Sequence, residues 1–162
     1  MCAAPTFYFK AKNIKMNVTL QRLFSRDLQK LKEEISLYQN EENIWLIDHH
    51  ISNSAGNLCL HLVGNLNTYI GAPFANTGYI RDRPYEFSAK GVPRTALLSM
   101  VENTIRVVDE ALDNITSDQL QQKFPILIFN EQDSTEYILI HLSTHLGYHL
   151  GQINYHRRLL DR

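Results

Sequence analysis

Histidine is concentrated near the carboxyl end of the chain. The sequence has seven histidines among 162 residues, and four of them fall within one window of 16 residues, where an even spread would place fewer than one. These four are His141, His145, His149 and His156. Imidazole nitrogens bind divalent metal ions, and two histidines spaced i, i+4 on a helix bring their rings to one ion. His145 and His149 have that spacing.

This window lies in a predicted helix over about 133–160. Asp133 as N-cap and Glu136 three residues later are typical of a capping box. At about 100° per residue, His145 and His149 fall on the apolar side of this helix. We therefore expect both rings to point into the protein, one turn apart.

A third candidate ligand, His61, lies on the apolar face of another predicted helix. That helix opens near Asn53 or Ser54, which are good N-caps, and is expected to stop before Gly71 and Pro73. An unpaired buried imidazole costs about 1–3 kcal/mol, and three imidazoles from two helices satisfy one another by binding a cation. Three nitrogens leave at least one coordination position free, as in catalytic zinc sites.

The alternative interpretation is structural. A single inward histidine is more often a hydrogen-bonded core residue than a ligand, and i, i+4 pairs also arise by accident. We interpret His141 and His156 as structural or surface residues rather than ligands.

Two further amphipathic helices accompany these two. One is expected over about 17–38, and the other begins at Pro93 and ends near Asp113-Asn114. Residues 71–92 read as a long loop, and residues 124–129 as a short extended connector. Four amphipathic segments predict an all-α four-helix bundle, with a long connection between its second and third helices, in one domain over 1–162.

Composition excludes several classes of protein. The formal net charge is −1, from 16 basic and 17 acidic residues, which gives no footprint for nucleic-acid binding. Two cysteines, Cys2 and Cys59, are too few for a disulfide framework. No apolar stretch is long enough to span a membrane, and no signal peptide is evident. The expected location is therefore the cytoplasm.

The chain resembles the DinB-like (YfiT-type) superfamily. The run from His145 to Ile153, His-Leu-Gly-Tyr-His-Leu-Gly-Gln-Ile, is similar to that group's His-x-x-x-His-x-Gly-Gln-Ile signature. The segment 53–66 resembles its second helix, which supplies the first histidine, and the loop 81–87 resembles one branch of it. The superfamily consists of bacterial four-helix-bundle proteins and includes the bacillithiol transferases.

The resemblance implies a metal site on His61, His145 and His149. It further implies a divalent ion, most commonly zinc or nickel, often a homodimer, and a small-molecule substrate such as a low-molecular-weight thiol. No motif specific to one thiol is present. The leading hypothesis is therefore a metal-dependent thiol transferase, with a hydrolase using the same site or a non-catalytic metal-binding dimer as alternatives.

Two amides lie close in sequence to the proposed ligands. Asn65 follows His61 by one turn, and Gln152 follows His149 by three residues. Either could orient a ligand or a bound water. Hydrogen bonding between helices is an equally good interpretation of both.

The loop 81–87 carries two arginines. Arg81 and Arg83 could clamp an anionic substrate, because guanidinium pairs bidentately with carboxylates. The structural alternative is an Arg–Glu86 ion pair that pins the loop. No carboxylate is placed well enough to be named a general base, so catalytic residues stay unassigned.

Overall fold

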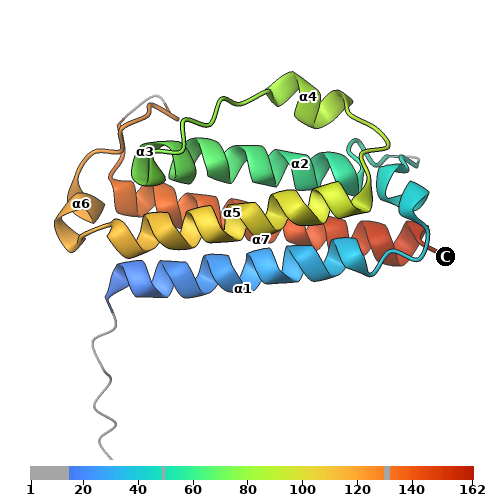
Figure 1. Cartoon of the computed structure of the whole chain (residues 1–162), viewed down its shortest axis with the longest axis horizontal. Helices are drawn as coiled ribbons and strands as arrows, with labels where there is room; N and C mark the ends of the chain where they lie inside the picture. The colour runs from blue at the N-terminus through green and yellow to red at the C-terminus, as the bar shows by residue number, and fades with distance from the viewer. Residues whose placement is uncertain (1–14, 49, 130–131) are drawn as a thin grey trace, which may run out of the picture.

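The computed structural model describes residues 15–48, 50–129 and 132–162, and four long helices dominate it (Figure 1). They are α1 (Met16–Ser36), α2 (Ala55–Leu66), α5 (Arg94–Asn114) and α7 (Thr135–Leu160). α1 packs against α5 and α7, and α2 packs against the same two helices, so α1 and α2 occupy opposite corners. The described residues contain no strand, only one isolated bridge between Lys123 and Ser134. The predicted all-α four-helix bundle is confirmed.

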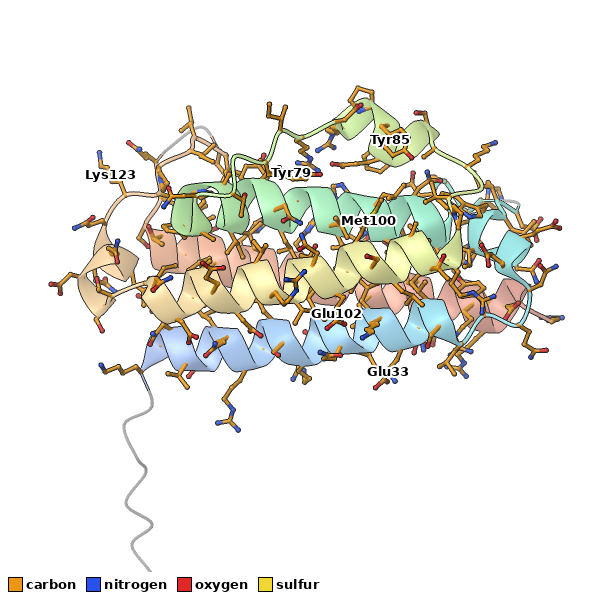
Figure 2. The ribbon with its side chains drawn as sticks, viewed as in Figure 1. Glu33, Tyr79, Tyr85, Met100, Glu102 and Lys123 are labelled. Carbon is orange, nitrogen blue, oxygen red and sulfur yellow. The ribbon has the colours of Figure 1, made fainter. Side chains whose placement is uncertain are left out.

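The core is built from one apolar stripe on each long helix. On α1 the stripe recurs every three or four residues, as predicted, and its side chains are at most 1% exposed. Glu33 on α1 and Glu102 on α5 lie on the outer faces (Figure 2), whereas Glu34 on α1 is buried and pairs with Arg157. The stripe residues are Leu20, Phe24, Leu28, Leu31 and Ile35 on α1; Leu58, Leu62 and Leu66 on α2; Leu97, Val101 and Val108 on α5; and Ile138, Leu142, Leu146 and Ile153 on α7.

The helix that carries His61 is longer than predicted. Ser54 caps it, accepting a hydrogen bond from the Asn57 amide, but it does not stop before Gly71. It continues through a π-helical turn, η2 (Asn67–Gly71), into α3 (Ala72–Ala75), and ends where Asn76 adopts a left-handed conformation. The wide π turn accommodates Pro73, whose ring would otherwise clash with the preceding turn of an α-helix.

The predicted long loop between the second and third helices is partly helical. It contains α4 (Arg83–Ser88), which Asp82 caps by accepting a hydrogen bond from the Tyr85 amide. α4 lies outside the bundle and packs on α2 (Figure 1). Two other short elements, η1 (Glu41–Trp45) and α6 (Ser117–Gln121), close the ends of the bundle.

The ends of α5 and α7 were predicted to within one residue. Pro93 is the residue before α5, which ends at Asn114. The cap of α7 is Ser134, not Asp133: the Ser134 hydroxyl accepts a hydrogen bond from the Tyr137 amide. Asp133 instead offers its backbone carbonyl to the amide of Phe124. Of the helices described, none has the length and apolar character needed to cross a membrane.

Candidate metal centre

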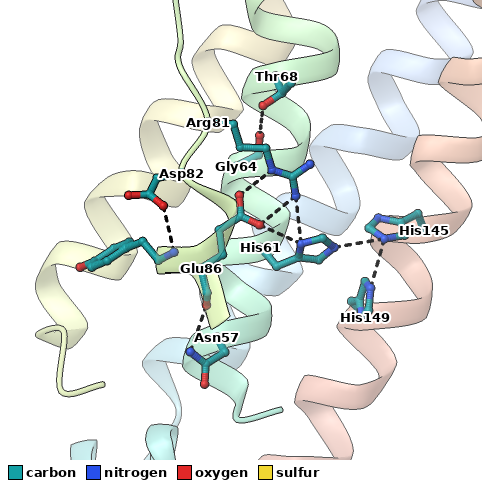
Figure 3. A network of polar contacts seen from close by, with 10 residues as sticks. Asn57, His61, Gly64, Thr68, Arg81, Asp82, Glu86, His145 and His149 are labelled. Atoms are coloured by element: carbon teal, nitrogen blue, oxygen red, sulfur yellow. Dashed lines mark hydrogen bonds and ion pairs between the residues drawn. The ribbon is translucent and has the colours of Figure 1, made fainter. Parts of the chain in front are cut away.

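Three histidines from two helices converge at one point. His61 comes from α2, and His145 and His149 from consecutive turns of α7 (Figure 3). The Nε2 atom of His145 lies 3.3 Å from that of His61 and 3.1 Å from that of His149. One nitrogen from each ring lies within 4.8 Å of the others, so the group could hold a metal ion.

The group sits at the edge of the core, between α2 and α7. His61 is 5% exposed, whereas His145 and His149 are half-buried. The buried stripe of α7 passes beside them, through Leu142 and Leu146. The two α7 rings therefore face α2 at the edge of the apolar stripe, on the apolar side of the helix where the sequence predicted them.

Hydrogen bonds at the Nδ1 atoms determine how two of the rings are protonated. His61 Nδ1 lies 3.0 Å from Glu86 Oε2, and His149 Nδ1 lies 2.6 Å from Gln152 Oε1. Both oxygens accept, so each Nδ1 donates its proton, and each Nε2 is left with a lone pair. Arg81 Nη2 also lies 3.1 Å from His61 Nδ1, but with that ring nitrogen protonated Nη2 donates to Glu86 Oε2 instead, at 2.8 Å. The two lone pairs point toward the Nε2 atom of His145.

His145 cannot satisfy both neighbours by itself. A single proton on its Nε2 would have to serve two acceptors, and its Nδ1 is buried without a hydrogen-bond partner among the described residues. A proton on Nδ1 would instead leave three lone pairs facing one another. A cation between the rings satisfies all three lone pairs, so this donor set fits a metal ion.

The spacing of the nitrogens fits the size of such an ion. Two nitrogens bound to one tetrahedral zinc at about 2.0–2.1 Å lie roughly 3.3–3.4 Å apart. The two Nε2 separations, 3.3 and 3.1 Å, are close to that value.

Burial keeps two of the rings neutral. Desolvation, with smaller contributions from His149, His61, His141 and Arg81, lowers the pKa of His145 to about 4. Desolvation also lowers the pKa of His61, although the hydrogen bond to Glu86 opposes it. Both rings are therefore uncharged at neutral pH, with one proton each, which is the form that binds metals.

Glu86 is the residue of this site that the sequence did not reveal as a partner of histidine. It comes from α4, is 4% exposed, and reaches His61 across 25 residues of chain. Arg81 holds it in a bidentate pair, with Nε 2.6 Å from Oε1 and Nη2 2.8 Å from Oε2. The Arg–Glu86 ion pair, which was the structural alternative for this loop in the sequence analysis, is thus present. Gly64, in the middle of α2, is the sequence signal that could have indicated a close approach here, because a glycine leaves room for another group against the helix.

The remaining candidate substrate residues lie around the same group. Asn65 is 8% exposed, and its Oδ1 has no hydrogen-bond partner among the residues described. Arg83 is exposed and stacks over the Phe87 ring at 5.5 Å. The Phe87 ring in turn lies 5.1 Å from that of His61.

Two other histidines stay outside the group. His156 is buried and lies between the Tyr38 hydroxyl, at 2.7 Å, and the Leu46 carbonyl, at 3.0 Å. His141 packs its ring edge-on against Phe129 at 5.0 Å. Their structural roles match the interpretation from sequence.

Cys59 takes no part in the site. Cys59 is fully buried with a free thiol, and burial raises its pKa to about 12. Cys2 lies outside the described residues.

A cavity of about 400 Å³ is lined by residues that neighbour the metal-binding group, but by none of its three histidines. Gln152, which contacts His149, forms part of its wall, as does Leu58, one turn before His61. The wall is mixed in character: His50, Ser52 and Asn53 are polar, and Ile51 and Leu159 are apolar. The cavity is large enough for a small organic molecule.

Comparison with known proteins gives a family and a fold. A family model described as "Protein of unknown function (DUF1572)" matches residues 15–162. No curated protein matches the chain. Among solved structures, the chain is similar to a conserved protein from Enterococcus faecalis, with a TM-score of 0.70 and 18% identity over 91% of this chain and 98% of that one. A likeness at this identity shows the fold alone.

Proposed function

Because the chain belongs to the DUF1572 family of proteins of unknown function, we propose a function from its own site: a divalent-metal-dependent enzyme of the thiol-transferase type. The observation that carries the proposal is the convergence of three imidazole rings, with the Nε2 of His145 3.3 and 3.1 Å from those of His61 and His149. The resemblance of residues 145–153 to the DinB-like signature supports zinc or nickel as the ion and a low-molecular-weight thiol as cosubstrate.

Each residue of the site has its own role in this proposal. His61, His145 and His149 hold the ion, which would lower the pKa of a bound thiol or water and so supply a nucleophile at neutral pH. Glu86 and Gln152 orient two of the rings through their Nδ1 atoms. Asn65 Oδ1, which is buried and has no partner in the described part of the chain, is the candidate acceptor for a bound water or a substrate donor. The body of the substrate lies in the adjoining cavity.

Arg81 and Arg83 have different roles in the proposal. The Arg81 guanidinium is bound to Glu86 on two of its nitrogens, so it serves the metal site. Arg83 is exposed above the Phe87 ring and remains the candidate for contacting an anionic substrate. A cytoplasmic location, which we also propose, would supply the thiol.

The test of the site is metal analysis of protein purified without an affinity tag. His61→Ala, His145→Ala and His149→Ala should each abolish stoichiometric metal binding. His141→Ala and His156→Ala are the matched controls and should retain it, because neither ring belongs to the group. If His61→Ala kept its metal while His156→Ala lost it, the proposed site would be wrong.

Turnover assays test the reaction. The loaded protein should consume a low-molecular-weight thiol when a model electrophile is present, and the alanine variants should not. Hydrolysis of a model ester without any thiol would indicate a hydrolase instead. Unfolding upon chelation with no turnover of either kind would favour a purely structural metal.

We also propose that the protein is a homodimer. Large side chains on α7 are exposed to solvent, with Tyr148 at 65%, Tyr155 at 64% and Leu159 at 48%. Adjacent exposed apolar side chains of this kind are typical of an interface. Tyr155→Arg should halve the mass measured by light scattering, and Leu37→Arg, at a 52% exposed position on the end of α1, should not. A wild-type protein with monomeric mass would contradict the proposal.

A further inference from the structure

Glu86 is buried although its helix lies outside the bundle. The segment of residues 81–89, called the latch below, contains α4 and crosses the outer face of α2 (Figure 1). Most of the latch is exposed, but Glu86 is 4% exposed and Ala89 is 8% exposed. The latch therefore places one charged side chain against the buried edge of the metal centre.

α2 has a gap in its side chains where Glu86 enters. Position 64 is a glycine, and a Cβ atom there would lie 2.8 Å from Glu86 Cδ and closer still to Oε1. Gly64 follows His61 by three residues, so the gap is beside the imidazole. No other residue type at position 64 would leave room for this carboxylate.

A buried amide on α2 holds the latch in register. Asn57 is 3% exposed, and its Nδ2 donates to the Glu86 carbonyl at 3.0 Å (Figure 3). It also donates to the Ala89 carbonyl at 2.9 Å. These two bonds fix the backbone at Glu86 and at the residue three positions after it. The Glu86 carboxylate then meets His61 Nδ1 at one oxygen and Arg81, from the latch itself, at both.

We propose that Glu86 is a positioning residue for the metal centre and that docking of the latch is coupled to metal occupancy. This inference rests on the proposed function, since it requires that His61 binds a metal. Glu86 accepts the proton of His61 Nδ1 and so keeps the Nε2 lone pair directed at the other two rings. A docked latch therefore favours metal binding, and by linkage bound metal favours the docked latch to the same degree.

Zinc affinity, measured by competition with a chelator, tests the positioning role. Glu86→Gln keeps the size of the side chain and removes its charge, and Gly64→Ala pushes the carboxylate away from His61. Each should weaken zinc binding about 10- to 100-fold, the usual cost of removing a side chain that orients a ligand. Gly151→Ala is the matched control, because a Cβ at position 151 meets nothing within 4 Å, and its affinity should equal that of the wild type.

Spectroscopy separates positioning from a loss of folding. Circular dichroism and urea unfolding should show that Glu86→Gln remains folded. Cobalt(II) substituted for zinc should then give a ligand-field spectrum in Glu86→Gln that differs from the wild-type spectrum, because a neutral acceptor at Nδ1 makes His61 a weaker ligand than a carboxylate does. A role for Glu86 confined to holding α4 in place would leave that spectrum unchanged and would overturn the positioning role.

Hydrogen exchange tests the coupling directly. The amides of Tyr85, Glu86 and Ala89 are bonded within the latch, to Asp82 and Tyr85. Zinc should slow their exchange in the wild type and leave it unchanged in Glu86→Gln. Amides in the middle of α1 provide the internal reference.

The outcomes separate this inference from the proposed function. If the wild type binds zinc, the variants bind it equally well and zinc does not change hydrogen exchange in the latch, the coupling is overturned and the metal centre stands. A wild type that binds no zinc would overturn both.

Discussion

Each ring of the metal-binding group has a different neighbour at its Nδ1 atom. His61 faces the charged carboxylate of Glu86, and His149 faces the neutral amide of Gln152. His145 has no partner at that atom within the described structure. Since a charged acceptor makes an imidazole a stronger ligand than a neutral one does, His61 should contribute most to metal affinity.

Gln152 should matter less than Glu86, because it is exposed and water can replace its oxygen at His149 Nδ1. We expect Gln152→Leu to weaken zinc binding by about 10-fold or less. Gln152→Glu should strengthen it, because an ionised acceptor bonds more strongly than an amide. Chelator competition measures both changes. A larger loss in Gln152→Leu than in Glu86→Gln would contradict this ranking.

The lowered histidine pKa values predict how the metal-free protein responds to acid. Burial lowers the pKa of His145 to about 4, from about 6.5 in an unfolded chain. Between these values the unfolded state binds more protons, so the free energy of unfolding falls as the pH drops from about 6.5 to about 4. The lowered pKa of His61 and that of His156 act in the same direction.

Urea unfolding in the presence of a chelator, repeated from pH 7.5 to pH 4, measures this response. His145→Leu should lose part of the pH dependence and keep the part due to the other two histidines. An unfolding free energy of the wild type that stayed constant across this range would contradict the lowered pKa values.

The sequence predicted the three histidines because their signal is local. The i, i+4 spacing of His145 and His149 follows from helix geometry alone, and His61 lies on the apolar face of its own helix. Glu86 could not be found in this way. Its contact with His61 depends on how a six-residue helix folds back over α2, and no periodicity encodes that path.

At the scale of the elements, the interior of each long helix was predictable and its ends were less so. The apolar stripes gave the core, but the π turn at Asn67–Gly71 carries the second helix past a proline that normally ends one. The cap of α7 was misplaced by one residue for a related reason. Asp133 and Ser134 are both good N-caps, and tertiary pairing of the Asp133 carbonyl with the Phe124 amide decides between them.

Two alanine substitutions test that assignment of the cap. Ser134→Ala should lower the free energy of unfolding by about 1 kcal/mol, because the Tyr137 amide loses its acceptor. Asp133→Ala keeps the backbone carbonyl that binds Phe124 and should cost less. Urea unfolding of the two variants gives the comparison. Equal losses, or a larger loss in Asp133→Ala, would restore the cap predicted from sequence.

For the whole molecule, the metal centre joins two helices that are far apart in the chain. His61 and His145 are separated by 84 residues, and α2 and α7 pack side by side along the bundle. A ligand that binds only the folded state raises the free energy of unfolding. The increase grows with the logarithm of the ratio of ligand concentration to dissociation constant. Zinc bound by these helices should therefore stabilise the fold as a whole, and not the site alone.

At a free zinc concentration 100 times the dissociation constant, the free energy of unfolding should rise by about 2.7 kcal/mol. For a chain of this size that gain corresponds to an increase in Tm of roughly 5–10 °C, which differential scanning calorimetry can measure and a chelator should reverse. His145→Ala should show no increase, whereas His141→Ala, whose ring packs on Phe129 outside the group, should match the wild type. An equal increase in wild type and His145→Ala would mean that zinc binds elsewhere on the protein.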